Sequence, residues 1–159
     1  SSDLKRASEL GFANIALGET SRDTLLQLLC NQIVEPKIGL TRPVALLNFP
    51  ASQSALAQIS HDDPRVAQRF EVYFKGIELA NGYQELRDAN EQQQRFEKEN
   101  SVRELAGLQT VPLDTNLIAA LESGLPMVSG VAVVFVRVLM LAAGTGSLRD
   151  VIAFTIGNA

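Results

Sequence analysis

The clearest pattern in the chain is an alternation of apolar and polar side chains over residues 69–86. The alternation has a period of two on both sides of Lys75-Gly76, which predicts two antiparallel strands joined by a tight turn at this dipeptide. Directly opposed residues of such a hairpin share a face. We therefore expect one polar face and one core face, the latter formed by Phe70, Val72, Phe74, Ile77 and Leu79.

The polar face of this hairpin should carry two glutamates. A two-residue turn places Tyr73 opposite Glu78 and Glu71 opposite Ala80, so the two glutamates form a diagonal pair with Cα atoms about 7–8 Å apart. Carboxylates at that distance repel unless a cation, a proton or water separates them. Their hard oxygens suit Mg²⁺ shared with a phosphate-bearing substrate. An ordinary polar outer face, which is common in antiparallel sheets, is the alternative.

A second group of polar residues follows at 81–85. The Asn81-Gly82 pair inside a strand pattern indicates a bulge or a close approach of another backbone. A one-residue bulge would shift the register and bring Glu85 to the face of Glu78. The resulting pocket would attract a cationic group, with Tyr83 as its apolar wall. An ordinary bend with surface polar side chains remains the alternative.

Capping residues, apolar faces and terminal glycines predict helices at 2–10, 20–36, 88–106, 114–124 and 137–143. Thr20 or Ser21 caps the second of these. Apolar runs predict two further strands, a buried one at 43–49 and another at 127–135. Helices interleaved with strands predict one domain over residues 1–159. Its expected fold is α/β (α+β), an antiparallel sheet flanked by helices.

Composition narrows the classes of function. The 159 residues are 46% hydrophobic, and their net charge of −4 disfavours a protein that holds nucleic acid by charge alone. A single cysteine, Cys30, excludes an internal disulfide and favours a reducing compartment, so we expect a cytoplasmic protein. We expect no leader and no membrane span, because no apolar run approaches about 20 residues.

Several segments resemble class II lysyl-tRNA synthetases. The stretch RFEVYFKGIELANGYQELRDANEQQQRF is similar to the segment of that family that carries metal and lysine contacts. The stretch GLPMVSGVAVVFVRVLML resembles the third signature motif, a glycine-rich strand followed by an arginine. FPASQSALAQIS and RDVIAF also match. TSRDTLLQLL, EQQQRFEKEN and Ala132 are similar to a truncated branch of the family that attaches (R)-β-lysine to a lysine of elongation factor P.

This resemblance implies a nucleotide site. It implies that Glu71 and Glu78 hold Mg²⁺ and the phosphates of ATP. Arg137 would be the catalytic residue, stacking on adenine and contacting the terminal phosphate.

The resemblance also implies an amino-acid site for lysine or β-lysine. Asn81 and Glu85 would receive the amino acid, and Glu85 would face its side-chain ammonium. Tyr83 would pack on the aliphatic part of the substrate, and Ala132 would shape the floor of the pocket.

The implied reaction is formation of an aminoacyl-adenylate and transfer of the aminoacyl group to elongation factor P. A tRNA acceptor is disfavoured by Ala132 and by the acidic charge. The full-length parent is expected to be a homodimer without membrane association. Two alternatives stay open, namely a piece of a lysyl-tRNA synthetase that charges tRNA, and a degenerate lysine-binding module without catalysis.

The chain also departs from the family pattern. Val134 stands where the family has glycine, Val136 replaces the aspartate before Arg137, and Arg87 replaces a small polar residue. The first two signature motifs would precede this chain. We therefore expect the C-terminal portion of a catalytic domain with a damaged nucleotide site, a poorly oriented Arg137, and exposed sheet edges or apolar surface.

We predict that the isolated chain forms no aminoacyl-adenylate, because the arginine and aromatic ring of the second motif are missing, Val134 crowds the third motif and Val136 replaces its aspartate. The measurement is ATP–pyrophosphate exchange dependent on lysine or (R)-β-lysine. Exchange above background by the purified chain would contradict the prediction.

Overall fold

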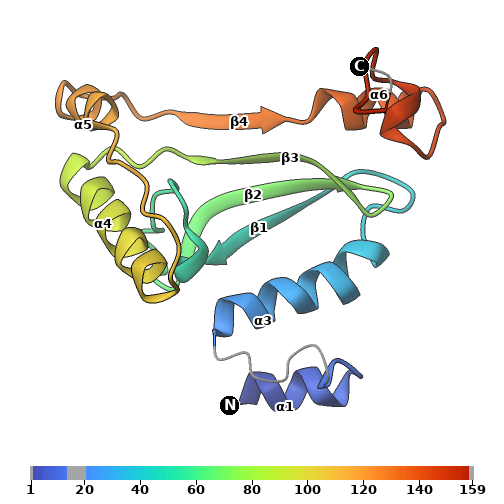
Figure 1. Ribbon diagram of the computed structural model, residues 1–159, viewed down its shortest axis with the longest axis horizontal. Helices are drawn as coiled ribbons and strands as arrows, with labels where there is room; N and C mark the ends of the chain where they lie inside the picture. Colours follow the sequence, from blue (N-terminus) through green and yellow to red (C-terminus); the bar gives the residue numbers. More distant parts are fainter. Residues whose placement is uncertain (1, 14–20, 158–159) are drawn as a thin grey trace. The chain divides into compact units, whose positions relative to one another are not determined.

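The computed structural model describes residues 2–13 and 21–157. Contacts divide the chain into two compact units. The first unit comprises Ser1–Leu47, Phe70–Asn81 and Val131–Ala159, and the second comprises Asn48–Arg69 and Gly82–Gly130. Four strands form one antiparallel sheet in the order β1-β2-β3-β4 (Figure 1). Their bounds are β1 Val44–Pro50, β2 Val66–Phe74, β3 Ile77–Gln84 and β4 Ser129–Val133.

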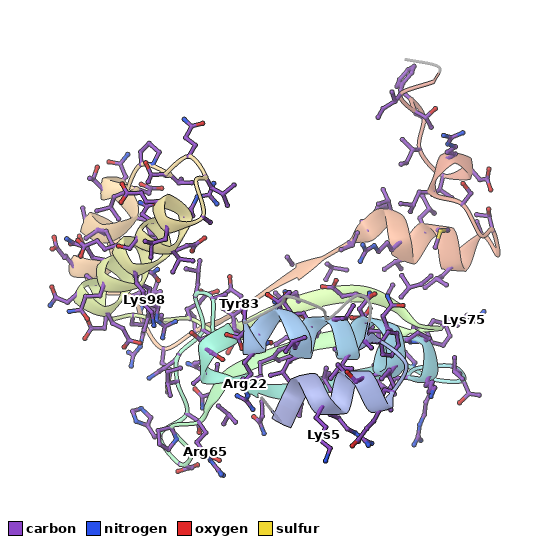
Figure 2. All side chains as sticks on the ribbon, turned by 60° about the horizontal axis from the view of Figure 1, so that its bottom comes forward. Lys5, Arg22, Arg65, Lys75, Tyr83 and Lys98 are labelled. Atoms are coloured by element: carbon purple, nitrogen blue, oxygen red, sulfur yellow. The ribbon has the colours of Figure 1, made fainter. Side chains whose placement is uncertain are left out.

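The β2–β3 hairpin confirms the predicted turn. Lys75 and Gly76 lie between the two strands with φ angles of 52° and 71°, as a type I′ turn requires. The N–H groups of Lys75 and Gly76 donate to the carbonyls of Gly39 and Ile38 at 2.7 and 3.3 Å. A Cβ at Gly39 would lie 2.6 Å from the carbonyl oxygen of Tyr73, so only glycine allows this approach. Figure 2 shows Lys75 at the tip of the hairpin.

The prediction that the apolar face of the hairpin is buried in the core is wrong. Its apolar residues are only half-buried: Phe70, Val72, Phe74, Ile77 and Leu79. The residues that are buried belong to the opposite face, where Glu71 is 9% exposed, Tyr73 2% and Ala80 6%. The reason is that the segment carrying Glu35 packs on that face and brings its carboxylate to the Tyr73 hydroxyl. The nominally polar face is therefore the covered one.

Both outer strands of the sheet carry exposed apolar residues, although the sequence predicts that β1 is buried. β1 is an edge strand rather than a buried one, and its Leu47 is 61% exposed. β4 forms the other edge, with Val131 and Val133 each 57% exposed. An apolar run alone does not distinguish a central strand from an edge strand. The expected exposure of sheet edges and apolar surface is confirmed for these residues.

The first unit contains α1 (Ser2–Glu9) and α3 (Arg22–Leu29), which pack together through a small apolar core (Figure 1). That core consists of Ala7 and Leu25, with Phe12 and Leu29 against it. The Ser21 side chain accepts a hydrogen bond from the Thr24 N–H at 3.3 Å and so caps α3. Thr20, the other candidate cap, lies outside the described residues.

The end of α3 is irregular. The chain continues as a π-helical turn over Cys30–Val34 and a 3-10 turn over Glu35–Lys37. A further helix of this unit is α6 (Phe135–Ala142), which begins two residues earlier than the predicted start at Arg137. Within the described residues, no helix is both long and apolar enough to cross a membrane.

The second unit contains α4 (Ala89–Leu105) and α5 (Thr115–Glu122), as predicted. Asp88 caps α4 by accepting from the Glu91 N–H at 2.9 Å, and Asp114 caps α5 in the same way. Arg95 attaches α4 to the segment before β2. Its Nη1 donates to the carbonyls of Ala55 and Ala57 at 2.7 and 2.9 Å, and its guanidinium pairs with Glu91.

Candidate functional site

Glu71, the first predicted metal ligand, is a buried carboxylate on β2 of the first unit. The Tyr73 hydroxyl donates a hydrogen bond to Glu71 Oε2 at 2.6 Å and lies 3.4 Å from Glu35 Oε1. Burial, the hydrogen bond to Glu71 and the nearby carboxylate charges raise the pKa of Tyr73 well above its ordinary value. The phenol therefore stays protonated and remains a donor to Glu71.

Cys30 belongs to the same part of the first unit and is half-buried. Burial, followed by the charges of Glu35 and Glu71, raises the pKa of its thiol. A thiol with a raised pKa is a poor nucleophile because the thiolate is the reactive form. The surroundings of Cys30, in the π-helical turn after α3, thus disfavour the reactive thiolate form.

Arg137 and Glu78 are in direct contact within the first unit. Arg137 Nη1 donates to the Glu78 carbonyl at 2.8 Å and lies 3.5 Å from Glu78 Oε2. The Val134 N–H donates to the Leu79 carbonyl at 2.8 Å, which fixes the junction between β4 and α6 beside Glu78. The expectation that Val136 leaves Arg137 without an orienting group is therefore wrong. Glu78 supplies that group from the neighbouring strand.

The donor set of the first unit fits a Mg²⁺ ion bound together with phosphates. Such ions are usually held through one or two carboxylates plus substrate phosphates. The two-residue turn places Glu78 opposite Tyr73, so Glu78 shares a face with Tyr73 and Glu71. In the described part of the chain, no group of three or more His, Cys, Asp or Glu side chains could hold a metal ion.

Two predicted amino-acid contacts of the first unit lie opposite each other. The hydrogen bond from Val134 to Leu79 sets the register of β3 and β4, and that register places Asn81 opposite Ala132. Asn81 is half-buried, and Ala132 is exposed. The structure thus pairs these two residues across neighbouring strands.

The second unit holds Tyr83 and Glu85, both half-buried. The Glu85 N–H donates to the Val128 carbonyl at 3.1 Å, and this register places Tyr83 opposite Gly130 and Glu85 diagonal to it. A side chain at Gly130 would collide with Glu85 Oε1. Burial and the charge of Glu85 raise the pKa of Tyr83, while Arg69 acts in the opposite direction. Figure 2 labels Tyr83.

At Asn81-Gly82 the pairing of β3 with β4 shows no extra residue. β3 and β4 advance by the same number of residues between the Leu79–Val134 and Glu85–Val128 hydrogen bonds. A bulge would place two residues of one strand against one of the other. Gly82 also lacks the positive φ of a glycine bulge. β3 is irregular at an earlier point, because the consecutive carbonyls of Glu78 and Leu79 both accept hydrogen bonds from the segment that carries Val134 and Arg137, whereas successive carbonyls of a regular strand point to opposite sides.

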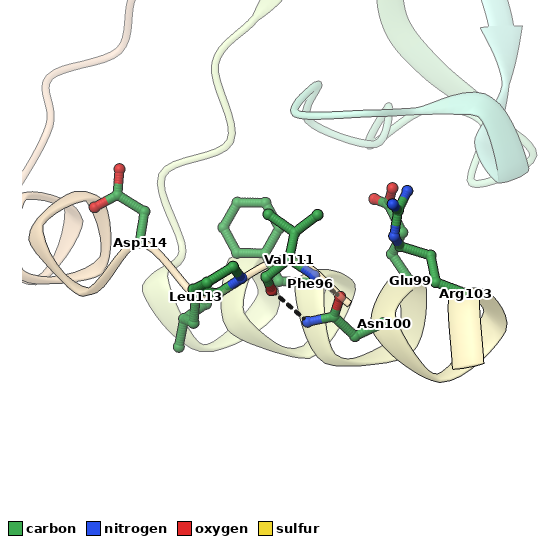
Figure 3. Close-up of a pocket in the computed structure, with 8 residues that line it drawn as sticks. Phe96, Glu99, Asn100, Arg103, Val111, Leu113 and Asp114 are labelled. Atoms are coloured by element: carbon green, nitrogen blue, oxygen red, sulfur yellow. Dashed lines mark hydrogen bonds between the residues drawn. The ribbon is translucent and has the colours of Figure 1, made fainter. Parts of the chain in front are cut away.

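The surface of the second unit has a hollow of about 270 Å³ between α4 and residues 111–114 (Figure 3). It is lined by Phe96, Glu99, Asn100, Arg103, Val111, Pro112, Leu113 and Asp114. The Asn100 amide bonds to the backbone of Val111 in both directions, at 2.8 and 2.9 Å. A second hollow of about 480 Å³ includes His61 and Arg87. None of the predicted site residues lines either hollow.

Comparison with known proteins identifies the family. Residues 22–157 match the family model of class II tRNA synthetases (D, K and N). The chain belongs to this class II synthetase family. Elongation factor P–(R)-β-lysine ligases of Salmonella dublin, Salmonella paratyphi B and Salmonella enteritidis are each 58% identical over 153 residues, covering 96% of this chain and 47% of each relative. The chain thus spans about half the length of these curated relatives.

Membership of the class II synthetase family confirms the predicted resemblance and fold class.

The sequence analysis did not identify three residues that contact the predicted site, namely Tyr73, Gly130 and Glu35. Tyr73 lies two residues from Glu71 on the same strand face, a spacing that could have indicated the contact. A glycine within a strand, such as Gly130, allows close approach. No signal in the sequence marks Glu35.

We predict that Tyr73→Phe destabilises the chain by about 1–3 kcal/mol, because the buried Glu71 carboxylate loses its short hydrogen bond. Urea denaturation at neutral pH measures the change. Tyr83→Phe is the matched control and should leave stability nearly unchanged. Equal stability of the two variants would show that the Tyr73 hydroxyl contributes nothing.

We predict that Glu85→Gln lowers the pKa of Tyr83 toward its ordinary value, because the negative charge that disfavours tyrosinate is removed. In the wild type the folded-state pKa lies above the unfolded value. The associated stability is therefore fully present below the unfolded pKa, near 10, and is lost as pH rises through the folded pKa.

Ultraviolet titration of tyrosinate measures this pKa, with Tyr83→Phe to assign the signal. Glu104→Gln, at an exposed position of α4, is the control for a general charge effect. A Tyr83 pKa that is the same in the Glu85→Gln variant and the wild type would contradict the prediction.

Proposed function

We propose that this chain carries ATP-binding and amino-acid-binding residues of a ligase that activates lysine or β-lysine. The observation that carries the proposal is the contact of Arg137 with Glu78. It joins the arginine of the glycine-rich strand–helix segment to a carboxylate of the hairpin segment. These are the two segments in which the resemblance places the nucleotide site. The 58% identity to elongation factor P–(R)-β-lysine ligases supports the choice of substrate.

We assign ATP to the first unit. Arg137 offers a planar cation that can stack on adenine and pair with the terminal phosphate, and Glu78 holds it in place. Glu71 and Glu78 would hold Mg²⁺, which neutralises phosphate charge when it is bound. Tyr73 keeps Glu71 in a defined position by its hydrogen bond.

We assign the amino acid to residues of both units, without a claim about their mutual placement. Glu85 would receive the side-chain ammonium, since a half-buried carboxylate forms a strong charge-assisted hydrogen bond. Tyr83 would pack on the aliphatic chain. Asn81 would bind the polar end of the amino acid, and Ala132, on the strand opposite Asn81, would limit the room beside it.

The proposed reaction has two steps. A carboxylate oxygen of the amino acid attacks the α-phosphorus of ATP, which forms the acyl–phosphate bond and releases pyrophosphate. The ε-amine of an acceptor lysine then attacks the carbonyl carbon, loses a proton and releases AMP. No protein nucleophile is needed, because positioning and neutralisation of developing charge suffice. We propose elongation factor P rather than tRNA as the acceptor, and a homodimer for the full-length parent.

We predict that the chain binds both Mg-ATP and lysine or (R)-β-lysine, as measured by isothermal titration calorimetry. Glu78→Gln should weaken Mg-ATP binding by about tenfold or more, since a charged partner of Arg137 is lost. Its lysine affinity should remain. Glu85→Gln should weaken the binding of lysine and leave the affinity for Mg-ATP unchanged. Glu104→Gln, an exposed change, should alter neither.

The same titrations separate the alternatives. Binding of lysine without any binding of Mg-ATP would overturn the ligase proposal and leave the degenerate lysine-binding module, which is favoured by Val134 at the position of a family glycine. Binding of neither ligand would contradict both functions.

A further inference from the structure

Gly130 occupies a position where the structure leaves no room for a side chain. It lies on β4 within the second unit, diagonal to Glu85 on β3. A Cβ atom at Gly130 would collide with Oε1 of Glu85. Gly124, Gly144 and Gly146 have no other atom within 4 Å of such a Cβ. The space at Gly130 is therefore filled by one carboxylate group.

The backbone of Glu85 is held on both sides, so it cannot move away from an added side chain. Its N–H donates to the Val128 carbonyl at 3.1 Å on β4. On the other side, Ala57 pairs with Glu85 in an antiparallel bridge, and the Leu86 N–H donates to the Leu56 carbonyl at 2.9 Å. The movable part is the end of the Glu85 side chain. A small substitution at Gly130 should thus displace the carboxylate and leave the fold intact.

We infer that Gly130 is a specificity-determining positioning residue for the amino acid with a side-chain ammonium. Its missing side chain lets the Glu85 carboxylate lie over β4 at Gly130, the residue that the strand register places opposite Tyr83. A carboxylate next to an aromatic wall matches an aliphatic chain that ends in an ammonium group. Gly130 acts only through Glu85 and does not touch the substrate. This inference rests on the proposed function, because it assumes that Glu85 receives the ammonium.

The test is a double-mutant cycle on the full chain, with calorimetric titration of L-lysine and (R)-β-lysine. Gly130→Ala should weaken binding about tenfold or more, because the charge-assisted hydrogen bond is displaced. Gly146→Ala is the matched control, since its Cβ meets no atom within 4 Å and its φ is not positive. It should leave affinity unchanged. In a Glu85→Gln background, Gly130→Ala should cause almost no further loss.

A ligand-free measurement accompanies the titrations. The ¹³C chemical shift of the Glu85 carboxyl carbon should change in Gly130→Ala and stay constant in Gly146→Ala, while thermal unfolding shows that both variants fold. An unchanged Glu85 signal overturns the inference. Wild-type binding that Gly130→Ala does not weaken, or a full additional loss in the Glu85→Gln background, overturns the inference alone. A wild-type chain that binds neither amino acid overturns the amino-acid part of the proposed function and the inference together.

Discussion

A buried carboxylate must be hydrogen-bonded, and this constraint organises the first unit. Glu71 is 9% exposed on β2, so an unpaired charge there would cost much of the stability of a small domain. The Tyr73 hydroxyl meets this need at 2.6 Å. Tyr73 is in turn kept neutral by burial and by the carboxylates around it. The covered face of the hairpin is therefore polar by construction, and Glu78 shares that face.

The register of strand β4 determines the positions of predicted site residues in both units. In the first unit, the hydrogen bond from Val134 to Leu79 fixes the start of α6 and so places Arg137 against Glu78. In the second unit, the bond from Glu85 to Val128 places the Glu85 carboxylate over Gly130. A shift by one residue would turn every side chain of the strand to the other face. The backbone pairing of β4 therefore determines both arrangements.

The features that were predicted correctly from the sequence are those that depend on residues close together in the chain. Asp88 and Asp114 cap helices, and Lys75-Gly76 forms a tight turn, because these residues act on their immediate neighbours. Burial was harder to predict, since β1 and the apolar hairpin face depend on what packs against them. The partner of Arg137 was missed for the same reason. Val136 removed the local candidate, and Glu78 comes from a strand distant in sequence.

The tight hairpin turn also limits how the chain can change in length. Both of its residues have positive φ, and the loop around Gly39 hydrogen-bonds to both of their N–H groups. One inserted residue would break these contacts and rotate Glu78 away from the face of Tyr73. Most surface turns tolerate insertions. This one joins two carboxylates whose alignment depends on its size, so variation by insertion or deletion should be confined to other loops of the chain.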